Sequence, residues 1–115
     1  MNTADRYTGY QRIDFDRPAP GVLRLTLNRP ERLNAAPPHM FDELRDAIAD
    51  LGSARAVLVA GEGRAFCSGA DVGGGALASD NPGEATFQAL TNHFHRTIAA
   101  FADLAVPVVS AVRGP

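Results

Sequence analysis

Residues 56–72 read AVLVAGEGRAFCSGADV, and the rest of the chain is best interpreted outward from this stretch. It opens with five apolar residues, the length and branching typical of a buried strand bounded by glycine. Two glycines then let the chain turn, and a second irregular run, residues 66–69, leads to Ala70. This layout leaves free backbone N–H groups beyond a strand end, where a negatively charged oxygen can be held. The same residues also fit a strand, a turn and a connector with a buried Cys67 and no functional role.

On the N-terminal side, the apolar pattern predicts a hairpin and a helix. Residues 10–16 and 22–28 predict two strands joined by a turn rich in proline and glycine, and alternating leucines give the second strand one buried face. Apolar residues at helical spacing predict a helix from His39 to Leu51. Two prolines precede this helix, and Gly52 is placed to end it.

On the C-terminal side, the pattern predicts a loop, a long helix and a strand. Residues 73–83 are small and rich in helix breakers, which is typical of a mobile loop. Residues 84–104 predict the longest helix, with an aromatic stripe that faces the core. Residues 106–112 predict a second buried strand.

Composition narrows the class of protein. The chain has 115 residues, of which 45% are hydrophobic and 21% charged, as in a soluble globular domain. The formal net charge of −2 gives no electrostatic reason to expect nucleic acid or an anionic membrane as partner. The single cysteine excludes an internal disulfide. Residues 1–9 contain no apolar core of the kind that a signal peptide needs, and no apolar run elsewhere has the length of a membrane span. We therefore expect a cytoplasmic protein.

Several common chemistries find no support in the sequence. His93 and His95 form no i, i+4 pair with another ligand type, so neither predicts a metal or acid–base role. Cys67 and Ser68 have no nearby histidine that would activate a nucleophile. The Gly-x-Gly at residues 61–63 lacks the third small residue of a dinucleotide-binding turn.

Three motifs resemble the signature sequences of the enoyl-CoA hydratase/isomerase (crotonase) superfamily. They are GEGRAFCSGAD at residues 61–71, NRPERLNA at residues 28–35 and PVVSAVRG at residues 107–114. All three occur in the family's order and close to its spacing. The resemblance implies an α/β fold of the crotonase (ClpP/crotonase) type, built from ββα units. It also implies that residues 1–115 are the N-terminal part of such a domain, truncated after the strand that ends at Gly114.

The activity that the resemblance implies is acyl-CoA processing by an enoyl-CoA hydratase/isomerase-like enzyme, a lyase or an isomerase. Negative charge builds on the thioester oxygen during the reaction, and two fixed backbone N–H donors hold it. By match to the motif, the Ala70 N–H is the first donor. The second donor and the acid–base carboxylates follow Gly114 in the family, so the 115-residue chain alone is expected to be inactive. The alternative is a non-catalytic acyl-CoA-binding or oligomer-modulating homologue.

The resemblance also implies a set of substrate-binding residues. Those matched to the coenzyme A site are Arg32, Leu33, Ser68, Gly69, Ala70, Asp71 and Val72. Arg32 can pair with a phosphate through its planar guanidinium, although a loop arginine is also often only solvated. Asp71 is interpreted as a cap for the turn after Ala70. The family implies no metal or cofactor besides the coenzyme A thioester substrate, and a homo-oligomer, a trimer or hexamer. Hydratase, isomerase, hydrolase, decarboxylase and dehalogenase activities are not separated by these residues.

Overall fold

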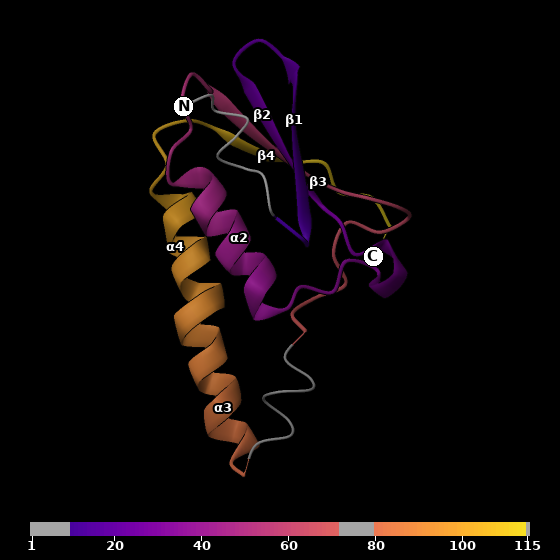
Figure 1. Cartoon of the computed structure of the whole chain (residues 1–115), viewed down its shortest axis with the longest axis vertical. Helices are drawn as coiled ribbons and strands as arrows, with labels where there is room; N and C mark the ends of the chain where they lie inside the picture. The colour runs from indigo at the N-terminus through magenta and orange to yellow at the C-terminus, as the bar shows by residue number, and fades with distance from the viewer. Residues whose placement is uncertain (1–9, 72–79, 115) are drawn as a thin grey trace.

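The computed structural model describes residues 10–71 and 80–114. Its four strands form one sheet in chain order, and they are β1 (Ile13–Ala19), β2 (Val22–Leu27), β3 (Ala56–Gly61) and β4 (Val108–Ser110). β1 and β2 are antiparallel, whereas β2, β3 and β4 run parallel. Helices α2 (Pro38–Ile48) and α4 (Arg96–Ala102) lie side by side against the sheet, and α3 (Pro82–Ala89) extends beyond it (Figure 1). The predicted α/β class is confirmed.

The hairpin has the predicted faces but a shifted first strand. Leu23, Leu25 and Leu27 of β2 are all buried, as their alternation predicted. β1 starts three residues later than the predicted start at Tyr10 and continues to Ala19, because the chain reverses at Gly21, where φ is +78°. On the exposed face, Arg24 pairs with Asp16. The hydrogen bond to this carboxylate, and then its charge, raise the pKa of Arg24 above the ordinary arginine value.

Helix α2 begins as predicted and ends early. Pro37 is the N-cap residue and Pro38 the first helical residue, where a missing N–H costs nothing. The prediction that the helix continues to Leu51 and ends at Gly52 is wrong, since the last helical residue is Ile48. The Asp50 carboxylate accepts a hydrogen bond from the Gly52 N–H at 3.0 Å, a local contact that competes with the helix.

The hydrophobic core lies between the sheet and α2. The strands and α2 contribute side chains that are no more than 2% exposed, namely Ile13, Leu23, Leu25, Met40, Ala47 and Val57. They come from β1, β2, α2 and β3, so the first half of the described chain supplies nearly all of the core. This packing fixes the ends of β2 and β3, from which two loops emerge.

The helical stretch predicted over residues 84–104 is interrupted by a π-helical segment, η2 (Leu90–His95), between α3 and α4. Phe94 is buried and packs edge-on against Phe41, with ring centroids 4.4 Å apart. The prediction of a core-facing stripe is wrong at Phe87 and Ile98, which are 66% and 60% exposed. A π turn contains an extra residue, so the apolar positions before and after it no longer share one helix face.

β4 is shorter and more exposed than the buried strand predicted over residues 106–112. It contains three residues, and the exposed fractions of Val108 and Val109 are 37% and 57%. β4 lies at the edge of the sheet and pairs only with β3 among the described strands. The apolar composition therefore predicted the strand correctly and its burial incorrectly.

Candidate functional site

Two loops meet beside the ends of β2 and β3. The first loop, residues 28–37, joins β2 to α2 and includes the 3₁₀ turn η1 (Pro30–Arg32). The second loop, residues 62–71, follows β3. They form a short parallel bridge, in which the Ala36 N–H donates to the Gly69 carbonyl at 2.9 Å and the Asp71 N–H donates to the Ala36 carbonyl at 2.8 Å. A third bond, from the Ser68 N–H to the Leu33 carbonyl, is 3.0 Å long.

This bridge determines the direction of the Ala70 N–H. In a parallel bridge, Ala36 forms its hydrogen bonds with Gly69 and Asp71, the two neighbours of Ala70. The N–H and carbonyl of Ala70 itself therefore point away from the first loop. Ala70 is exposed, and its N–H donates to no group within residues 10–71 and 80–114. An oriented donor at an exposed position is the feature that an anionic oxygen requires.

The structure brings most of the predicted site residues together. Leu33 contacts Ser68 through the backbone, and the three residues that follow Ser68 complete the bridge. Arg32 lies at the end of η1 with an exposed side chain, and no hydrogen bond or ion pair joins it to the second loop within the described residues. Val72 lies outside the described residues, as does most of the loop predicted over residues 73–83.

Asp71 has an additional partner that the sequence did not indicate. Its carboxylate Oδ2 lies 3.2 Å from a guanidinium nitrogen of Arg29, and the same nitrogen donates to the Ala35 carbonyl. The predicted cap would involve residues after Asp71, which are outside the described part of the chain. The observed role of this carboxylate is an ion pair between the two loops.

Besides Arg29, the sequence interpretation missed Asn34. Its side chain is fully buried and makes three hydrogen bonds to backbone atoms of both loops. The signal was its place inside the NRPERLNA motif at residues 28–35, together with the tolerance of asparagine for left-handed backbone. Periodicity could not have found it, because its partners are distant in sequence.

Two glycines allow the chain to pass close to the second loop. A side chain on Gly61 would place its Cβ 2.6 Å from the Phe66 carbonyl oxygen. One on Gly114, where φ is +61°, would lie 2.4 Å from the Arg64 carbonyl oxygen. The Phe66 N–H donates to the Arg113 carbonyl at 3.0 Å. The motifs at residues 61–71 and 107–114 are therefore packed against one another.

An apolar cavity of about 300 Å³ lies between the sheet and the helices. Met40 and Leu44 of α2, Phe101 of α4, and Phe66 and Cys67 of the second loop contribute to its lining. Ala70 does not line it as the described residues outline it. The cavity is thus adjacent to the second loop, on the side of the helices.

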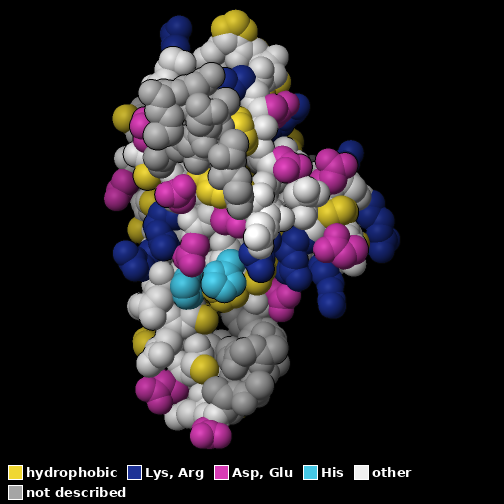
Figure 2. All heavy atoms as spheres, in the orientation of Figure 1, with side chains coloured by type: hydrophobic (Ala, Val, Ile, Leu, Met, Phe, Trp, Pro, Cys, Tyr) yellow, Lys and Arg dark blue, Asp and Glu magenta, His cyan; other side chains and the backbone are white. Residues whose placement is uncertain are grey.

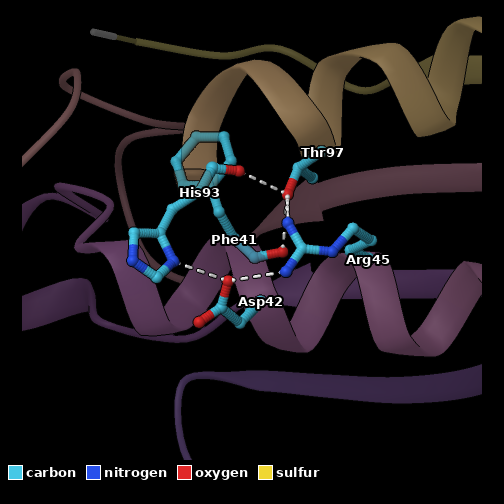
Figure 3. A network of polar contacts seen from close by, with 5 residues as sticks. All are labelled: Phe41, Asp42, Arg45, His93 and Thr97. Atoms are coloured by element: carbon cyan, nitrogen blue, oxygen red, sulfur yellow. Dashed lines mark hydrogen bonds and ion pairs between the residues drawn. The ribbon is translucent and has the colours of Figure 1, made fainter. Parts of the chain in front are cut away.

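A polar network joins α2 to the π segment and α4 (Figure 3). The Asp42 carboxylate lies 2.8 Å from the Nδ1 of His93 and 3.0 Å from a guanidinium nitrogen of Arg45. The buried Thr97 hydroxyl lies 2.9 Å from the Phe41 carbonyl and 2.8 Å from that of His93. His93 therefore connects two helical elements.

Three further observations concern the surface charge, metal ligands and helices of the described residues. Figure 2 shows basic and acidic side chains mixed over the right-hand part of the face, where Figure 1 places η1. Within residues 10–71 and 80–114, no three histidine, cysteine or acidic side chains are grouped so as to hold a metal ion. No helix in this part of the chain is long and apolar enough to cross a membrane.

The chain was compared with known families, sequences and structures. The family model described as enoyl-CoA hydratase/isomerase matches residues 17–115. The chain belongs to the enoyl-CoA hydratase/isomerase family. It is 41% identical over 99 residues to a probable enoyl-CoA hydratase, echA6, of Mycobacterium bovis, a match that covers 84% of this chain and 37% of that protein. It is 32% identical over 97 residues to the 1,2-epoxyphenylacetyl-CoA isomerase of Escherichia coli, covering 82% of this chain and 37% of that enzyme.

Solved structures of the same family share the fold. An enoyl-CoA hydratase/isomerase from Xanthobacter autotrophicus Py2 is 36% identical, with a TM-score of 0.78 over 92% of this chain and 40% of that one. The crotonase-type fold predicted from the three motifs is confirmed for its N-terminal portion. The chain spans between 37% and 40% of the length of these three family members.

Proposed function

We propose that the chain forms the N-terminal part of an acyl-CoA enzyme, in which the Ala70 N–H receives the oxygen of a thioester enolate. The observation that carries the proposal is the geometry of Ala70. Its N–H is exposed and turned away from the first loop, on a segment held by three backbone hydrogen bonds of 2.8–3.0 Å. A donor fixed in this way stabilises developing charge without having to reorganise, which water must do.

Hydration and isomerisation of an enoyl thioester place charge on the same atom. In hydration, the water oxygen bonds to the β-carbon as a base takes a proton from the water, and the displaced π electrons move to the thioester oxygen. A proton then adds to the α-carbon. In isomerisation, a base removes a carbon-bound proton, the electrons again reach the thioester oxygen, and a proton returns to another carbon. The family description names both a hydratase and an isomerase, and the relatives include a probable enoyl-CoA hydratase and an isomerase of an epoxyphenylacetyl-CoA, so the proposal is a lyase or an isomerase.

The remaining predicted residues form the proposed coenzyme A site. Arg32 is exposed on the first loop and offers a guanidinium to a phosphate of coenzyme A. Leu33, Gly69, Asp71 and Val72 are proposed to line the path of the substrate, and Ser68 joins this set through its contact with Leu33. The thioester is the substrate, with no other cofactor. We further propose that the enzyme is cytoplasmic and forms a homo-oligomer, a trimer or hexamer.

Titration of the ¹⁵N-labelled chain with acetoacetyl-CoA, an enolisable thioester, tests this function by NMR. We expect the Ala70 amide resonance to shift, whereas free coenzyme A, which lacks the thioester carbonyl, leaves it in place. Ala70→Pro deletes the N–H and should weaken binding about tenfold, while Ala70→Gly keeps it and should bind as the parent does. A folded Ala70→Pro chain with unchanged affinity would contradict the proposal. Thioester binding without a response at Ala70 would instead favour a non-catalytic acyl-CoA-binding protein.

A further inference from the structure

The side chain of Asn34 is the point at which three backbone segments are joined. Its Oδ1 accepts a hydrogen bond from the Arg29 N–H at 2.7 Å, and its Nδ2 donates to the Glu62 and Ala65 carbonyls, both at 2.9 Å. The side chain is 0% exposed, so no water replaces these bonds. One amide thereby ties the end of β2 to the turn after β3, and its two donors and its acceptor oxygen are all used.

The backbone at this point is held in an uncommon conformation. Leu33 and Asn34 have φ angles of +51° and +55°, in the left-handed region that non-glycine residues rarely adopt. This left-handed pair places the Leu33 carbonyl and the Ala36 backbone against the second loop, where they bind Ser68, Gly69 and Asp71. A conformation of this kind persists only when surrounding contacts determine it, and the bonds of Asn34 are such contacts.

Arg29 adds a second tie between the loops. One guanidinium nitrogen donates to the Ala35 carbonyl and lies 3.2 Å from the Asp71 carboxylate. The side chains of Arg29 and Asp71 are 20% and 37% exposed, so this pair is partly shielded from water. Ala35 precedes the bridge residue Ala36, and Asp71 follows Ala70. Arg29 therefore holds both sides of the bridge that directs the Ala70 N–H.

We propose that Asn34 and Arg29 are positioning residues for the Ala70 N–H. Asn34 fixes the left-handed turn that presents Ala36 to the second loop, and Arg29 holds Asp71 against that turn. Neither side chain needs to touch the substrate. This inference rests on the proposed function, because it assigns a purpose to the direction of the Ala70 N–H.

The test uses the same ¹⁵N-labelled chain and acetoacetyl-CoA with three variants. Asn34→Gly removes the side chain yet permits the positive φ, and Arg29→Met removes the guanidinium yet keeps much of the stem. Arg24→Met is the matched control, since Arg24 also pairs with an aspartate, Asp16, on the exposed face of the hairpin. The readouts are the dissociation constant from the Ala70 shift, and the Leu23 and Leu25 amides as a check that the sheet is folded.

We expect a dissociation constant about tenfold higher for Asn34→Gly and for Arg29→Met, with the sheet resonances unchanged, and no change for Arg24→Met. If the parent chain responds at Ala70 and both variants respond with the parent's affinity, the positioning role is wrong and the proposed function stands. An equal loss of affinity in Arg24→Met would also overturn the positioning role, because the loss would then not depend on the contacts between the two loops. If Ala70 does not respond in the parent chain, the proposed function fails first. Should Asn34→Gly not fold, Arg29→Met decides.

Discussion

β3 and β4 are neighbouring parallel strands rich in valine, yet only β3 has buried side chains. Val57 of β3 is 1% exposed, while Val108, its partner in register, is 37% exposed and Val109 is 57% exposed. β3 has a strand on each side and α2 over one face, whereas β4 has only β3 beside it among the described strands. An apolar run thus predicts that a strand forms, and the neighbours decide how much of it is removed from water.

The largest expected effect concerns turnover. Within the described residues, Ala70 is the one proposed oxyanion donor. The resemblance to the family implies that the second donor and the acid–base carboxylates come after the segment that matches residues 107–114. Each such group contributes a factor of about 10² or more, so the purified 115-residue chain should hydrate crotonyl-CoA at a rate far below the usual value of about 10 per second. Loss of the enoyl absorbance at a rate near that value would show that this division of the site is wrong.

The next largest expected effect is self-association of the chain through the exposed edge strand β4. Val109 and Val112 are 57% and 65% exposed, and β4 presents a free strand edge. At about 25 cal/mol per Å², burying roughly a few hundred Å² of such surface is worth several kcal/mol, comparable to the stability of a small domain. We expect the chain to associate with copies of itself, or to have a low melting temperature. Size-exclusion chromatography measures the association, and thermal unfolding measures the melting temperature.

One substitution tests whether β4 is responsible. Val109→Lys places a charge on the exposed edge and should shift the chain toward the monomer, while Ser53→Lys, in an exposed turn, should not. A parent chain that is monomeric at every concentration and melts cooperatively above about 60 °C, in the upper mesophile range, would refute this prediction.

The paired valines give a direct measure of the comparison. Val57→Ala removes two buried methyl groups and leaves a cavity, which should lower the free energy of unfolding by about 2 kcal/mol or more. The same change at Val109 removes groups that are already largely in water, so it should cost no more than about 0.5 kcal/mol. Urea unfolding of the two variants gives both values. Equal losses would mean that Val109 is covered in solution, by a second copy for example.

The contrast also explains how far the fold could be predicted. Alternation in β2 and the prolines before α2 are local signals, and both gave the correct element. The C-terminal end of α2 depends on the contact of Asp50 with the Gly52 N–H, and the exposure of Phe87 depends on the π segment. Periodicity encodes neither. The prediction that β4 is buried was also wrong, since the burial of a strand depends on elements distant in the chain.

The candidate site divides in a similar way. Motif resemblance predicted Ala70 and its neighbours as site residues, and the structure brings Leu33 against Ser68. Asn34 and Arg29 were not assigned a role, although both lie in the quoted motif. Their importance comes from partners near residues 62–71, and the sequence does not show which carbonyls a buried amide will reach.

The smallest predicted effect is at the contact between α2 and α4. The Thr97 hydroxyl is buried and lies within hydrogen-bond distance of the Phe41 carbonyl and of Arg45. Thr97→Val keeps the shape but removes these bonds, so the free energy of unfolding should fall by about 1 kcal/mol. Thr91→Val makes the identical change at an exposed position of the π segment and should cost no more than about 0.5 kcal/mol. Urea unfolding of both variants measures the difference, and equal stabilities would mean that the hydrogen bonds of the Thr97 hydroxyl add no net stability to the contact between α2 and α4.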